Sequence, residues 1–76
     1  MRDNYDIQLS EREERILDEL PVGALDKQIA GKLDIAQSTV KADIKAILRK
    51  LRVDNRTQAA NWAWHRNQHR KKQKLN

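Results

Sequence analysis

The sequence predicts an all-α domain of four helices, and three observations lead to that expectation. The chain has 76 residues, which is enough for one small domain. Apolar residues recur three or four positions apart in successive segments, as on one face of a helix. The breaks between these segments carry residues that end helices or start turns, among them Pro21 and Gly23. We expect a flexible lead-in over 1–8, a helical domain over 9–65 and a basic tail over 66–76.

The first two helices have recognisable ends. Ser10 is expected to cap the first helix with its hydroxyl, and Glu13, three residues later, completes a capping box. Asp26 is a candidate cap for a short second helix over 27–33. That helix is expected to end at Asp34, because Asp tolerates the left-handed backbone found at helix ends.

The third helix is expected over 37–51, with one apolar face and one polar face. Its apolar residues form a continuous stripe: Val40, Ile44, Ile47, Leu48 and Leu51. At about 100° per residue, the opposite arc carries small and basic residues: Ser38, Lys41, Ala42, Lys45, Ala46, Arg49 and Arg52. Asp43 lies on the far flank of this arc, where its charge is expected either to weaken phosphate contacts or to select against some sequences. Ala36 offers no side-chain cap, so this end of the helix is expected to fray.

The fourth helix is expected to begin at Arg56, after a cap by Asn55, and to run to about Trp64 or beyond. Three small residues share one of its faces: Ala59, Ala60 and Ala63. Trp62 is expected in the core and Trp64 on a partly exposed flank. Little can be buried from Arg66 onward, so we interpret that segment as a fraying helix or a disordered basic tail.

Charge is divided unevenly along the chain, whose net charge is +5. Residues 1–36 hold five basic and nine acidic residues, a balance of −4. Residues 37–76 hold eleven basic and two acidic residues, a balance of +9. A basic half attracts polyanions, which leaves open a nucleic acid, an acidic membrane face or an acidic protein.

Several classes of function are disfavoured by length and composition. A chain this short cannot build both a core and a deep pocket, so we expect no enzyme, no catalytic residues and no cofactor. It has no Cys, and His65 and His69 lack further ligands nearby, so no metal site is expected. Neither a long apolar run nor a signal peptide is present, which favours a cytoplasmic protein without a membrane partner.

Two short helices joined by a tight break, the second with a basic outer face, are typical of a helix-turn-helix. A helix of this kind fits the major groove of DNA. Lys41 and Lys45, one turn apart, can both reach O6 and N7 of guanine, while Ala42 allows close approach and can meet a thymine methyl group. These three residues are the candidate base contacts.

The ordered set of segments resembles the C-terminal DNA-binding domain of the LuxR/NarL/FixJ type, most of all its NarL branch. The resemblance runs from about Leu9 to Trp62. The segments that carry it are Leu9-Ser10-Glu11-Arg12-Glu13, Asp26-Lys27-Gln28-Ile29-Ala30, Leu33-Asp34-Ile35-Ala36-Gln37-Ser38-Thr39-Val40-Lys41, Arg49-Lys50-Leu51 and Asn55-Arg56-Thr57.

The resemblance implies a four-helix helix-turn-helix bundle that binds specific sequences of double-stranded DNA in a bacterial transcription regulator acting at the nucleoid. The recognition helix would be Gln37–Leu51, with base contacts from Lys41, Ala42 and Lys45. A second group of residues, which includes residues at the edges of the basic arc, would contact phosphates: Lys27, Ser38, Arg49, Asn55 and Arg56. The fourth helix would pair two domains weakly on DNA through Ala59, Ala60 and Ala63. RNA polymerase is a further expected partner.

The sequence leaves other functions open. The domain could act as a protein-interaction module that pairs with a regulator and blocks it, although Lys41 and Lys45 argue against that role. RNA binding is a weaker option, because the narrow major groove of RNA does not admit a helix. Trp62 and Trp64 could stack on single-stranded bases. The basic tail is either solvated or a nonspecific phosphate-binding arm, and the chain is either part of a longer regulator or a stand-alone factor.

Overall fold

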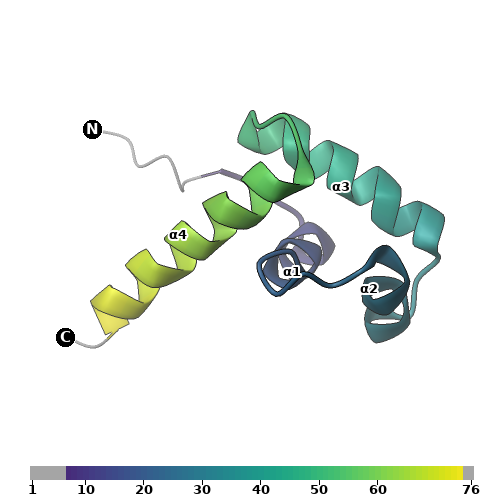
Figure 1. Cartoon of the computed structure of the whole chain (residues 1–76), viewed down its shortest axis with the longest axis horizontal. Coiled ribbons are helices and arrows are strands. Elements are labelled where there is room, and N and C mark those ends of the chain that lie inside the picture. The colour runs from purple at the N-terminus through teal and green to yellow at the C-terminus, as the bar shows by residue number, and fades with distance from the viewer. Residues whose placement is uncertain (1–6, 75–76) are drawn as a thin grey trace.

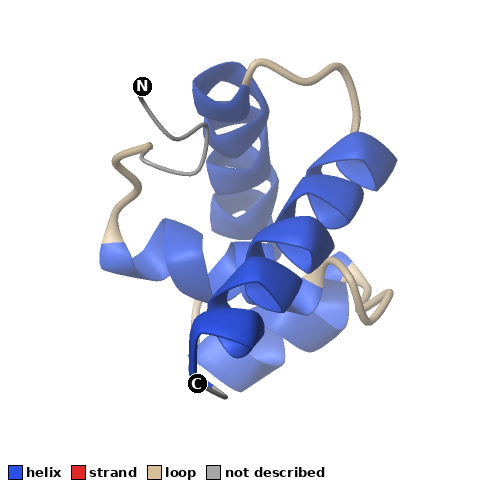
Figure 2. Ribbon diagram, turned by 90° about the vertical axis from the view of Figure 1, so that its left-hand side faces the viewer, coloured by secondary structure: helices blue, strands red, loops and turns tan. Residues whose placement is uncertain are grey.

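A computed structural model describes residues 7–74, and within that range the chain forms only helices, turns and loops (Figures 1 and 2). The helices are α1 (Glu11–Glu19), α2 (Asp26–Leu33), α3 (Gln37–Leu51) and α4 (Arg56–Lys74). The all-α prediction is confirmed. None of the described helices is long and apolar enough to cross a membrane.

The capping box predicted for the first helix is present. The hydroxyl of Ser10 accepts a hydrogen bond from the backbone N–H of Glu13 at 3.0 Å. In return, the Glu13 carboxylate accepts one from the backbone N–H of Ser10 at 2.9 Å. Glu13 is itself buried, whereas Ser10 is exposed.

The cap predicted for the second helix was wrong by one position. Leu25 occupies the N-cap position and Asp26 is the first residue of α2. The backbone N–H of Leu25 is satisfied by the side chain of Gln28, at 2.8 Å. The Asp26 carboxylate instead accepts a hydrogen bond from Arg56 at 2.6 Å, and so joins α2 to α4.

The break between α2 and α3 follows the prediction. Asp34 has φ 59° and ψ 48°, the left-handed conformation that ends a helix. Ile35 then packs against the core and fixes the direction of the turn. Ala36 precedes α3 and, as expected, makes no side-chain cap.

The core is formed where the apolar stripe of α3 meets the other helices. Val40, Ile44, Ile47 and Leu51 are all buried, as the periodicity predicted. The other helices bury apolar residues against that stripe: Ile16, Leu17 and Leu20 of α1, Ile29 and Ala30 of α2, and Ala59 and Ala63 of α4.

The alanine face of α4 therefore needs a correction. Ala59 and Ala63 are 0% exposed, because their small side chains let α4 pack closely on the core. They offer no surface to a second molecule, so they cannot form a pairing face. Ala60 alone of the three is partly exposed, and it packs against the edge of the core.

One residue of the segment from which little burial was expected is packed into the domain. Arg66 is only 2% exposed. Its guanidinium lies 3.0 Å from the carboxylate of Glu14 and 3.5 Å from that of Asp18, both in α1. It also lies 5.2 Å from the ring centroid of Trp62, a cation–π distance. A boundary after His65 would cut α4 before this contact.

The lead-in and the tail that were expected from the sequence have different outcomes in the structure. Ile7 packs against the core, so the lead-in expected over 1–8 does not extend that far, and residues 1–6 lie outside the described range. At the other end, the backbone stays helical to Lys74, which corrects the alternative of a disordered tail. That end of α4 leads away from α3 (Figure 1).

Candidate nucleic-acid interface

The outer face of α3 carries the predicted base-contacting residues together. Lys41, Ala42 and Lys45 are all exposed, on the side opposite the buried stripe. Ser38 and Arg49 are exposed on the same helix. We call the surface of these five residues the reading face. Because the other side of α3 is packed into the core, the reading face has a fixed direction relative to the domain.

Two of the residues predicted to meet phosphates lie outside α3. Lys27 is exposed in the first turn of α2. Asn55 is exposed before α4, where its side-chain oxygen accepts a hydrogen bond from the backbone N–H of Gln58 at 2.9 Å. The prediction that Asn55 caps the fourth helix is confirmed.

Arg56 has a structural role that the sequence analysis missed. Its Nη1 donates to Asp26 at 2.6 Å, and its Nη2 donates to the backbone oxygen of Ala24 at 2.8 Å. These bonds hold the first turn of α4 against the start of α2. Arg56 is therefore partly occupied within the domain, and only its remaining donors are available to a ligand.

Asp43 does not lie free beside the reading face, which corrects the interpretation made from the sequence. Its carboxylate accepts two hydrogen bonds from Arg12 of α1, one from Nε at 2.5 Å and one from Nη2 at 3.1 Å. The hydrogen bond and then the charge of Asp43 raise the pKa of the Arg12 guanidinium. The acid is thus neutralised by a partner from another helix.

A second ion pair ties the same turn of α1 to α3. Lys50 lies 2.8 Å from the carboxylate of Glu13. Burial raises the pKa of Glu13, but hydrogen bonds from Lys50 and Ser10 and the charge of Lys50 outweigh it, so the net pKa is lowered. Adjacent residues of α1, Arg12 and Glu13, therefore hold α3 at two points about two turns apart.

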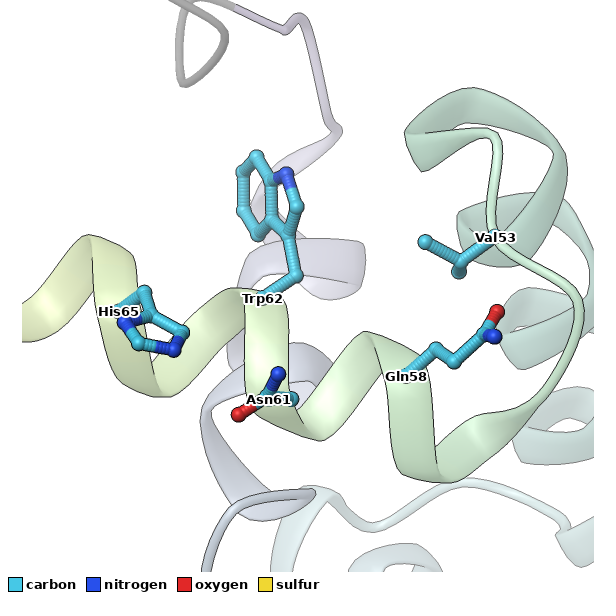
Figure 3. Close-up of a pocket in the computed structure, with 5 residues that line it drawn as sticks. All are labelled: Val53, Gln58, Asn61, Trp62 and His65. Atoms are coloured by element: carbon cyan, nitrogen blue, oxygen red, sulfur yellow. The ribbon is translucent and has the colours of Figure 1, made fainter.

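The exposed side of α4 has two shallow hollows. One, of about 410 Å³, lies between Trp62 and the loop before α4, and Figure 3 shows its lining. Its residues are Val53, Gln58, Asn61, Trp62 and His65. The other, of about 270 Å³, is lined by Pro21, Thr57, Ala60, Asn61 and Trp64. Within the described range, no group of three or more metal-binding side chains could hold an ion.

Known proteins with similar sequences agree with this architecture. A family described as bacterial regulatory proteins, luxR family, matches residues 7–63. The glycerol metabolism activator of Pseudomonas putida is 51% identical over 51 residues, which are 67% of this chain and 23% of that protein. The nitrate/nitrite response regulator protein NarL of Escherichia coli is 44% identical over 55 residues, 72% of this chain and 26% of that protein.

A third relative has the same extent of similarity. The probable csgAB operon transcriptional regulatory protein of Salmonella typhimurium is 44% identical over 55 residues, again 72% of this chain and 26% of the relative. The similarity thus spans about a quarter of the length of each relative. The family match covers all four helices as far as Ala63 and confirms the resemblance seen in the sequence. The chain belongs to the luxR family of bacterial regulatory proteins and carries a DNA-binding helix-turn-helix.

Proposed function

We propose that this domain binds specific sequences of double-stranded DNA by placing α3 in the major groove. The observation that carries the proposal is the exposed reading face on a helix whose other side is buried in the core. Lys41 and Lys45 donate to guanine edges, and Ala42 between them leaves room for a close approach to the bases. A bacterial regulator that does this acts at the nucleoid.

Phosphate contacts would set the position of α3 without reading sequence. The exposed donors for these contacts are Ser38 and Arg49 on the reading face and Lys27 and Asn55 outside it. Arg56 joins them only with the donors that Asp26 and Ala24 leave free. A regulator held on a promoter in this way would stand close to RNA polymerase, which we propose as a further partner.

Titration against duplex DNA, duplex RNA and single-stranded DNA tests the proposal. We expect the duplex DNA to bind most tightly, because only its major groove admits α3. With roughly three to five phosphates contacted, log K should fall with log salt at a slope of about −3 to −5. A preference for RNA or single strands, or a slope near zero, would contradict the proposal. Selection from random duplexes would then give the preferred site.

We also propose that two domains pair through α4 when they bind adjacent half-sites. The correction to Ala59 and Ala63 moves the pairing surface to exposed residues of α4, chiefly Asn61 and Trp64, beside the partly exposed Ala60. Trp64 is 50% exposed, and Asn61 lines both hollows on this side. So small an apolar area supports pairing on DNA rather than a stable dimer in solution.

The substitution Trp64→Glu is expected to weaken binding to DNA with two half-sites more than binding to one half-site. A charge on each copy at the twofold contact would repel its counterpart, whereas a single bound domain would not feel it. Binding to both duplexes is measured at one salt concentration. Val22→Glu, at an exposed apolar position outside α4, is the matched control. An equal loss on both duplexes for Trp64→Glu would contradict pairing through this surface.

A further inference from the structure

Arg12, a cation of α1, pairs with Asp43 on the flank of α3, and none of the contacts proposed above uses it. Arg12 has five N–H donors, and Asp43 engages it through Nε and Nη2. The remaining donors belong to a side chain that is 51% exposed, whereas the side chain of Asp43 is only 13% exposed. The pair therefore turns its cation toward solvent and covers its anion.

The position of Asp43 on α3 decides where that cation lies. At about 100° per residue, Asp43 falls on the flank between the buried stripe and the reading face. Thr39 and Ala46, the residues one turn before and after it on this flank, are small. They leave the side of Arg12 open toward a duplex lying against the reading face.

The dimensions of the groove bring a phosphate backbone to this flank. A helix with its side chains is about 10–12 Å across, and the major groove is about 12 Å wide. A helix that fills the groove thus has a row of phosphates along each side. We propose that Arg12 contacts a DNA phosphate on the α1 side of α3, and that Asp43 is the positioning residue that aims it there.

This inference rests on the proposed binding of duplex DNA and adds a contact from outside the two helices of the helix-turn-helix. Guanidinium suits the position, because its planar fork can hold a carboxylate along one edge and a phosphate along another. Asp43 then has an effect opposite to the one expected from its charge alone. It brings an arginine of α1 to the DNA instead of repelling the phosphates.

Removing both charges of the pair together gives the sharpest test. The variant Arg12→Gln with Asp43→Asn keeps the net charge at +5, so a change in binding reports the contact and not the overall field. We expect the slope of log K against log salt to become shallower by about 0.9, the value for one phosphate. Affinity at about 0.15 M salt should fall roughly threefold to tenfold, by the same factor on a selected site and on scrambled DNA.

A matched control replaces another ion pair between helices. Lys32 of α2 lies 2.9 Å from Glu19 of α1, and its side chain is 66% exposed. Lys32→Gln with Glu19→Gln also conserves net charge, and it should leave slope and affinity unchanged. Thermal melting of each variant, followed by circular dichroism, ensures that only folded domains are compared.

A third variant separates charge from geometry. Arg12→Lys keeps the charge but loses the fork, so the slope should stay while affinity falls about threefold. If the variant without either charge binds with the wild-type slope and affinity, the inference is overturned. Should that variant fail to fold, wild-type affinity in Arg12→Lys overturns it. Failure of the wild type to bind duplex DNA would instead overturn the proposed function.

Discussion

Replacing Ala63 by Glu is expected to unfold the domain. Ala63 is 0% exposed and lies in the core beneath α4. A longer, charged side chain there either forces α4 off the core or buries a carboxylate without a partner, at a cost of several kcal/mol. Domains of this size are stable by only about 5–10 kcal/mol. Circular dichroism should show loss of helix and of a cooperative urea transition.

Asn61→Glu is the control for this prediction. Asn61 is exposed on the other side of the same helix, two positions earlier, and receives the same new charge. Its effect on the free energy of unfolding should stay within about 0.5 kcal/mol, as for most surface substitutions. A cooperative transition retained by Ala63→Glu would show that α4 does not pack on the core as described.

Lys45→Ala is expected to cost about 1–3 kcal/mol of binding free energy on a selected site, the value of a good contact to a base edge. On scrambled DNA the loss should be smaller, because there the lysine acts only through its charge. Lys45 is exposed on the reading face and the substitution buries nothing, so stability should change little. Both duplexes are titrated at one salt concentration.

Lys72→Ala serves as the comparison, since it removes the same charge near the end of α4 that leads away from α3 (Figure 1). It should weaken binding slightly and equally on both duplexes. If Lys45→Ala and Lys72→Ala lose the same amount on both, α3 does not read sequence and the reading face is assigned wrongly.

The features that could be predicted from the sequence are those determined by residues within one or two helical turns of each other. The capping box joins Ser10 and Glu13, three residues apart, and the left-handed end of α2 depends on Asp34 alone. The buried stripe of α3 follows from helical spacing. Each of these is set by local geometry, so the pattern of neighbouring residues was sufficient.

Contacts between helices could not be predicted from neighbouring residues in this way. Arg12 and Asp43 are 31 positions apart, and Arg66 and Asp18 are 48 apart. No local pattern pairs one charge with another at such separations, so Asp43 seemed free and Arg66 seemed part of a solvated tail. Which partner each charge has depends on how the helices cross, and that is a property of the packed fold.

The alanines of α4 illustrate an ambiguity of a different kind. A face of small residues permits close approach, but its composition does not say whether the approaching helix belongs to the same molecule. Ala59 and Ala63 pack against the core of their own domain, whereas the exposed residues beside them on α4 are accessible to a second copy. The burial of each residue in the structure distinguishes the face of α4 that packs on the core from the face that is exposed to solvent.

Four of the ion pairs between helices share an asymmetry with a kinetic consequence, whereas the pairs of Arg66 with Glu14 and Asp18 bury the cation instead. Arg12, Lys32, Lys50 and Arg56 are each more exposed than the carboxylate they pair with. Beyond a screening length of about 10 Å, a polyanion feels each pair as nearly neutral. Only when the polyanion contacts the domain does it reach the cation before it reaches the carboxylate. The Arg12–Asp43 pair, which we propose to contact DNA, therefore adds little to the rate at which a duplex is captured, and its effect falls on how long the duplex stays bound.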